Sequence, residues 1–105
     1  MTMKHSISNA HLHVSVLNQG TELCSLKSNK TGVEFMWQAD PKVWGSHAPV
    51  LFPAIGSFRN DVCTIDGKEY QIPKHGFIRH NEELVLHEKT ETELHFLLNY
   101  SDKTL

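Results

Sequence analysis

The stretch HLHVSV, residues 11–16, alternates polar and apolar residues and sets the pattern for most of this chain. Successive side chains of a strand point to opposite faces, so Leu12, Val14 and Val16 would share one face. The stretch LHFLLNY, residues 94–100, alternates in the same way. This period of two predicts half-buried β-strands at both places.

Shorter strand-like segments lie between these two, and turn residues separate them. They are residues 3–8, 22–28, 33–37, 68–72 and 83–89. Asp66-Gly67 is the strongest hairpin signal, because both residues tolerate the positive φ of a type I′ turn. The one helical hint is a short turn at residues 40–44, with Asp as N-cap and Pro at the first helical position. The sequence therefore predicts an all-β fold of antiparallel strands.

Length and charge limit the classes of function. A chain of 105 residues suits one small domain, and its net charge of −2 comes from mixed acidic and basic residues. Nucleic-acid binding needs a concentrated basic surface, so no nucleic-acid partner is expected. No run of about 18 apolar residues predicts a membrane span, and residues 1–13 have no apolar core of a secretory signal. We therefore expect a cytoplasmic protein without a membrane partner.

The cysteines and histidines do not indicate a metal site. Cys24 and Cys63 lie far apart without a CxxC motif, which favours two free thiols. His11 and His13 share a predicted strand face, but two ligands are too few for a structural metal site. We expect them on an exposed polar face and predict no bound metal.

One block departs from the plain strand pattern. The stretch WGSHAPVLFPAIGSFRN, residues 44–60, is followed by HGFIRH, residues 75–80. Together they bring aromatic residues beside Arg and His donors, in a long loop stiffened by prolines. Aromatic rings cover the apolar face of a pyranose while polar groups orient its hydroxyls, so the block predicts a sugar site.

These stretches resemble the aldose 1-epimerase (galactose mutarotase-like) family, and more closely its bacterial branch associated with lactose operons. The segments that carry the resemblance are GTELCSLKSNKTGVEFMWQADPKVWGSHAPVLFPAIG and DGKEYQIPKHGFIRH. The resemblance spans about residues 7–100 and implies the family's large twisted β-sandwich, or supersandwich. Because members are roughly three times as long, residues 1–105 are expected to form a single partial domain, the N-terminal third of that sandwich.

The resemblance also implies the chemistry. Mutarotation opens a pyranose and closes it on the other face of C1, using a general base and a general acid. No metal, nucleotide or other cofactor is needed. In the family the acid is a His and the base a Glu, both well downstream of the HGF motif, and nothing here aligns with either. We therefore expect an aldose 1-epimerase-like chain that carries no catalytic residue, so whether it acts as an enzyme alone stays open.

Substrate-binding residues are expected in the HGF segment and just before it. By resemblance His75 positions the sugar, and Arg79 offers a planar fork suited to vicinal hydroxyls or a phosphate. In an extended segment these two side chains would face the same way. Arg59 is the expected third donor, although relatives in this branch often have a basic residue where Ser57 stands.

The neighbouring aromatic and histidine residues are expected to have mainly structural roles. Phe52 and Phe77 are expected in the core, since buried aromatics outnumber ligand-facing ones. Trp44 fits core and site equally. His47 is expected to donate to the loop backbone and hold the loop in shape.

Three other readings stay open at this point. The chain could be related to hexose-6-phosphate 1-epimerases, could form a non-catalytic carbohydrate-binding module, or could be a truncated product without activity. In each binding reading the partner is a small-molecule sugar. The apolar face of Leu94, Phe96 and Leu98 and unpaired sheet edges would also favour self-association.

Overall fold

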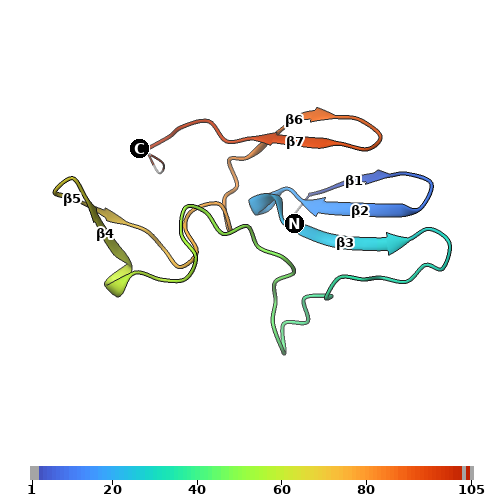
Figure 1. The fold of residues 1–105 in the computed structure, drawn as a ribbon, viewed down its shortest axis with the longest axis horizontal. Coiled ribbons are helices and arrows are strands. Elements are labelled where there is room, and N and C mark those ends of the chain that lie inside the picture. The colour runs from blue at the N-terminus through green and yellow to red at the C-terminus, as the bar shows by residue number, and fades with distance from the viewer. Residues whose placement is uncertain (1–2, 103, 105) are drawn as a thin grey trace.

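A computed structural model describes residues 3–102 and residue 104, and it is built from antiparallel β-hairpins (Figure 1). Its strands are β1 Lys4–Ser8, β2 Leu12–Leu17, β3 Leu23–Ser28, β4 Val62–Ile65, β5 Lys68–Gln71, β6 Val85–Lys89 and β7 Leu94–Leu97. Two single 3-10 turns, η1 Gln19–Thr21 and η2 Arg59–Asp61, are the helical elements of the described residues. The predicted all-β, antiparallel fold is confirmed. None of the described residues forms a helix long and apolar enough to cross a membrane.

The strands form three separate antiparallel sheets. Strands β1, β2 and β3 form the largest, while β4–β5 and β6–β7 are two-stranded hairpins. The β6–β7 hairpin lies beside β1, where the Phe96 and His5 rings meet edge-on at 5.5 Å (Figure 1). The β4–β5 hairpin projects from the opposite end of the molecule as an arm.

Two turn predictions agree with the structure. Asp66 and Gly67 have φ values of 51° and 79° and close a two-residue loop between paired Ile65 and Lys68. At residues 40–44 the amide of Trp44 donates to the carbonyl of Asp40 at 2.8 Å. The Asp40 carboxylate accepts from the amide of Lys42 at 2.9 Å, as the N-cap prediction requires.

The predicted strand at residues 33–37 is wrong. This segment forms a single bridge, between Lys27 and Glu34. The Glu34 carboxylate accepts hydrogen bonds from the amides of Leu26 at 2.8 Å and of Met36 at 3.3 Å. It therefore occupies the Leu26 donor that a backbone carbonyl of a pairing strand would otherwise take.

The apolar face of the β6–β7 hairpin that was expected to lack part of its cover is partly covered. Leu94, Phe96 and Leu98 are half-buried, and Phe96 contacts His5 of β1. Val85 and Leu97, which pair on the other face of the same hairpin, are 50% and 45% exposed. The hairpin therefore has apolar side chains with incomplete cover on both faces, and self-association through them stays a prediction.

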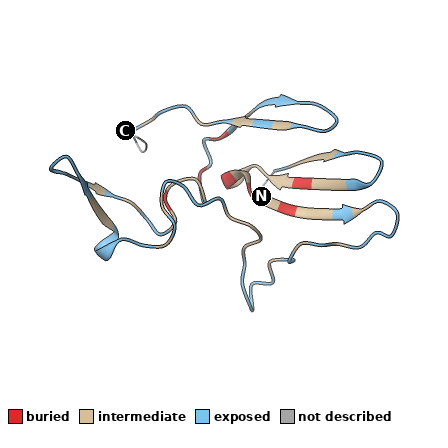
Figure 2. Cartoon of the chain, viewed as in Figure 1, coloured by how far each residue is buried: buried red, intermediate tan, exposed pale blue. Residues whose placement is uncertain are grey.

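The described residues have very little core. Cys24 and Leu84 are the only buried hydrophobic side chains among them, and Figure 2 shows buried residues only near the centre of the molecule. The radius of gyration is 16.3 Å, whereas a compact domain of this length has about 13 Å. The accessible surface is 7794 Å², against about 6,000 Å² for a compact protein of this size. The chain thus exposes roughly 1,800 Å² more surface than a compact domain would.

Candidate functional site

The FPAIG and HGF stretches, far apart in sequence, lie side by side. The amide of Phe52 donates to the carbonyl of His75 at 3.2 Å, and the amide of Phe77 donates to the carbonyl of Phe52 at 2.9 Å. Gly76 forms a parallel bridge with Phe52 and has a φ of 83°. A Cβ at Gly76 would overlap the Phe52 carbonyl and come within 2.6 Å of the Pro53 nitrogen. The glycine of HGF is therefore required for this close approach.

His75 is held by Gly56 through two hydrogen bonds. The His75 amide donates to the Gly56 carbonyl at 2.8 Å, and the Gly56 amide donates to His75 Nδ1 at 2.9 Å. Because Nδ1 accepts a hydrogen bond, the proton of the neutral ring is on Nε2. Partial burial lowers the pKa of His75, and the positive charges of Lys74 and Arg79 lower it further. The ring is thus a neutral hydrogen-bond donor through Nε2.

Arg79 offers a donor that nothing in the described chain occupies. Its Nε is buried and has no hydrogen-bond partner there, and no carboxylate of residues 3–102 pairs with its side chain. Its backbone packs closely against η1, where a Cβ at Gly20 would overlap the Arg79 carbonyl oxygen. A buried donor without a partner costs about 1–3 kcal/mol, so a ligand or another polypeptide segment could satisfy it.

The backbone between the two predicted donors differs from the one expected. His75 and Gly76 both have positive φ, so residues 75–79 form turns rather than an extended strand. The argument from strand alternation is therefore wrong for this segment. The positive charge of Arg79 nevertheless contributes to the lowered pKa of His75, after burial and Lys74.

Arg59 belongs to a different element from His75 and Arg79. It is exposed in η2, at the base of the β4–β5 arm (Figure 1). The cations that act on the His75 ring are Lys74 and Arg79. The role of Arg59 as a third donor stays a prediction, and Ser57 is likewise exposed.

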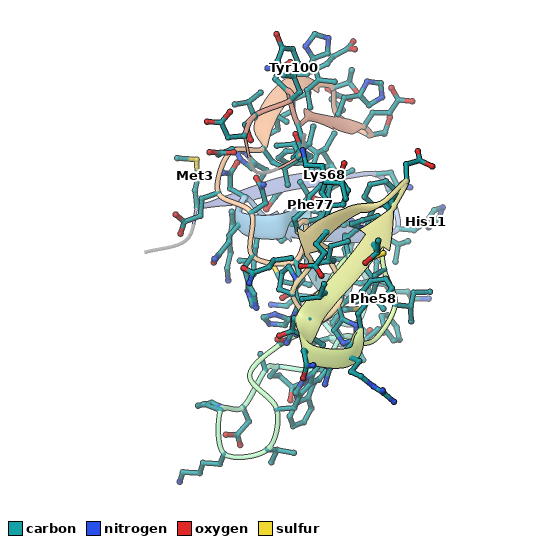
Figure 3. All side chains as sticks on the ribbon, turned by 90° about the vertical axis from the view of Figure 1, so that its left-hand side faces the viewer. Met3, His11, Phe58, Lys68, Phe77 and Tyr100 are labelled. Carbon is teal, nitrogen blue, oxygen red and sulfur yellow. The ribbon has the colours of Figure 1, made fainter. Side chains whose placement is uncertain are left out.

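The aromatic residues only partly follow their predicted roles. Phe52 is 56% exposed, so the prediction that it is a core residue is wrong for this chain. Phe77 is half-buried and meets Phe52 edge-on, with ring centres 6.0 Å apart. Phe77 also lines a cavity of about 500 Å³ together with Lys68 and Tyr70. Figure 3 labels Phe77 and Lys68 among the side chains. Trp44 is 47% exposed, and its carbonyl accepts from Trp37 Nε1 at 2.8 Å.

His47 holds the loop through a partner that the sequence did not indicate. Its Nδ1 and its amide lie 3.1 Å and 3.2 Å from the same carboxylate oxygen of Glu22, which is 8% exposed. The loop is therefore tied to the start of β3, rather than to its own backbone as expected. The sequence did not indicate Glu22, because a Glu at the end of a strand is expected on the surface. No group of three metal-ligating side chains occurs among the described residues.

The hairpins and the joined segments together match one known class of fold. The backbone resembles the galactose mutarotase related enzyme of Lactobacillus acidophilus, with a TM-score of 0.91 and 41% identity. A galactose mutarotase-like protein of Lactobacillus casei gives a TM-score of 0.90 at 28% identity. These structures confirm the galactose mutarotase-like fold.

Sequence comparison places the chain in a family. The aldose 1-epimerase family model matches residues 3–100, so the chain belongs to the aldose 1-epimerase family. Protein LacX of Lactococcus lactis is 39% identical in its plasmid form and 38% in its chromosomal form, over 99 residues.

The chain spans about a third of the length of these relatives. The match covers 90% of this chain but 32% of each LacX protein. It likewise covers 97% of this chain and 34% or 35% of the two solved structures.

Proposed function

We propose that this chain supplies part of the sugar-binding wall of an aldose 1-epimerase fold. His75 and Arg79 donate hydrogen bonds to the hydroxyls of a neutral aldose, with Arg59 as a third donor. The reaction that this site serves is the interconversion of α and β anomers. The general acid and base come from a part of the fold that residues 1–105 do not contain.

The observation that carries this proposal is the pair of unused donors. Arg79 Nε is buried without a partner among the described residues, and the neutral His75 ring has its proton on Nε2. A hydroxyl-rich ligand has acceptor oxygens for both donors, and a hydrogen bond from a guanidinium is charge-assisted. Both donors lie on the HGF segment, which four hydrogen bonds join to the FPAIG segment, and this favours a preformed site.

The charge of the site favours a neutral sugar over a sugar phosphate. The lowered pKa of His75 keeps its ring uncharged at neutral pH. Ser57 contributes no charge, and the chain as a whole carries −2. A phosphate would require Arg or Lys side chains held against it, whereas hydroxyls require only orientation.

His75 is assigned to binding and not to acid–base chemistry. Its Nδ1 is already engaged by the Gly56 amide, so only the Nε2 proton faces a ligand. A neutral imidazole with one nitrogen occupied orients a hydroxyl as a donor. To act as an acid, the ring would have to give up the Nε2 proton with which it binds the hydroxyl.

Binding of glucose and of glucose 6-phosphate by the chain tests the proposal. We expect glucose to shift the NMR signals of the His75 ring and the Arg79 Nε–H. Arg79→Ala should weaken both ligands modestly, and Lys89→Ala, an exposed cation on β6, should change neither. If glucose 6-phosphate binds far more tightly and only its binding needs Arg79, the site is for sugar phosphates. If neither ligand shifts these signals, the assignment of the donors is wrong.

A further inference from the structure

Large exposed apolar side chains are concentrated in one segment. Sixteen large hydrophobic residues of the described chain are exposed, and ten of them lie in residues 33–58. The ten are Val33, Phe35, Trp37, Val43, Trp44, Val50, Leu51, Phe52, Ile55 and Phe58. Large exposed apolar surfaces mark interaction sites, so this segment is the candidate for one.

The same segment is fixed to the sheet by polar contacts. The Glu34 carboxylate accepts from the Ser25 hydroxyl and from the amides of Leu26 and Met36. The Ser25 hydroxyl and these amides lower the pKa of Glu34, which keeps the carboxylate charged and bonded. Further along, Ala48 bridges Leu23 of β3, and His47 bonds the buried carboxylate of Glu22.

An anchored backbone with outward apolar side chains is a preformed docking surface. The side chains do not need to be ordered from a flexible loop when a partner arrives, so little conformational entropy is lost. A loop without such anchors would instead fold its apolar side chains onto its own sheet. We call residues 33–58 the apolar loop.

The uncovered area exceeds what a typical dimer requires. The chain exposes 7794 Å², roughly 1,800 Å² above a compact protein of its size. A standard interface buries about 800 Å² per partner, while permanent complexes bury 2,000–5,000 Å² in total. This excess, taken over the whole chain, is in the range of a permanent, core-like interface rather than a transient contact.

We propose that the apolar loop is the docking surface for a polypeptide with the fold of the remaining two-thirds of the related structures. The Lactobacillus acidophilus enzyme has this chain's backbone over 97% of the chain, in a protein about three times as long. A surface that follows that backbone so closely complements the rest of that fold.

The test combines the full 105-residue chain with the part of the Lactobacillus acidophilus enzyme that this chain does not match. We expect the two polypeptides to elute together as a one-to-one complex in size-exclusion chromatography with light scattering. Hydroxyl-radical footprinting reads the surface directly, because both tryptophans of the chain, Trp37 and Trp44, lie in the apolar loop and are 36% and 47% exposed. Their oxidation should fall several-fold in the complex. If the added polypeptide is insoluble alone, the same footprint is measured with the two parts joined in one chain.

A matched pair of substitutions locates the interface. Ile55→Asp places a charge on the apolar loop at a residue that is 85% exposed, so the free chain should tolerate it. It should weaken the complex at least about tenfold, because a charge would be buried without a partner. Ile65→Asp makes the same change on the β4–β5 arm at 51% exposure and should weaken it less than threefold.

Three results would overturn the inference. The chain alone could form a stable dimer in which Trp37 and Trp44 are protected, which would make a second copy the occupant. The added polypeptide could bind without protecting either tryptophan. The two Ile→Asp variants could also weaken the complex equally, and then the apolar loop would not be the docking surface. None of these readouts depends on sugar binding, so a failure here is distinct from a failure of the proposed function.

Discussion

Replacing Gly76 by Ala tests whether the close approach of the HGF and FPAIG segments builds the site. A non-glycine residue at its φ of 83° costs about 1–2 kcal/mol. The new Cβ would also overlap the Phe52 carbonyl and force the two segments apart. That movement would break the two hydrogen bonds between Phe52 and residues 75 and 77, at about 1 kcal/mol each. The expected loss of unfolding free energy is therefore about 3–4 kcal/mol.

Gly67→Ala is the matched control. Gly67 has a φ of 79°, but no atom lies within 4 Å of the position its Cβ would take. This variant should lose only the conformational cost, about 1–2 kcal/mol. The difference of about 2 kcal/mol between the variants measures the close approach itself.

Urea unfolding followed by circular dichroism gives the unfolding free energies of both variants, provided that the slope of free energy against urea concentration is the same for each. Hydrogen exchange at the Gly56 amide is a second readout, since this amide bonds the His75 ring. It should exchange faster in Gly76→Ala and be unchanged in Gly67→Ala. Equal losses of stability in the two variants, with an unchanged Gly56 amide, would refute the reasoning.

Two further predictions concern the groups that support the site. Glu22→Ala should cost about 1–3 kcal/mol of unfolding free energy, because it leaves the amide and ring of His47 without their buried acceptor. The control Glu93→Ala removes an exposed partner of His95 and should cost less than about 1 kcal/mol. Thermal unfolding of the two variants compares these losses. NMR titration should give His75 a pKa below its ordinary 6.5, and Arg79→Ala should move that pKa back upward. Since the folded-state pKa is lowered, the stability from neutral His75 is complete above about pH 6.5 and declines as the pH falls from there toward the folded-state pKa. A His75 pKa that is raised, or that Arg79→Ala lowers further, would contradict this assignment.

The local patterns of the sequence predicted the hairpins well. Alternation at residues 11–16 and the Asp66-Gly67 turn depend on side-chain periodicity and backbone freedom, which neighbouring residues determine. Residues 33–37, predicted as a strand but found with a single bridge, show the limit of such patterns. Glu34 folds its carboxylate back onto the Leu26 amide, and this side-chain bond replaces strand pairing.

The site was predictable only in part, for the same physical reason. His75 and Arg79 could be selected from the HGF segment, but the Gly56 bond to His75 joins residues 19 positions apart. The Glu22–His47 pair joins residues 25 positions apart. Tertiary structure creates such contacts, and neither periodicity nor turn chemistry contains them.

The exposure of Phe52 has a related cause. The sequence indicates that an aromatic residue is apolar, but burial depends on what packs against it. Here the ring meets only the edge of Phe77 among the aromatic rings of the described residues and stays 56% exposed. Chemical type alone therefore could not distinguish a core residue from a residue of an interface.

Polarimetry of freshly dissolved α-D-galactose or α-D-glucose tests the central claim most directly. We predict that the chain alone leaves the rate of anomer exchange at that of the buffer, because removing acid–base groups forfeits about 10²–10⁴-fold. The complex with the remaining part of the Lactobacillus acidophilus enzyme should accelerate the exchange, and Arg79→Ala in this chain should reduce that acceleration. Acceleration by the chain alone would contradict the account, as would a complex whose rate is unaffected by Arg79→Ala.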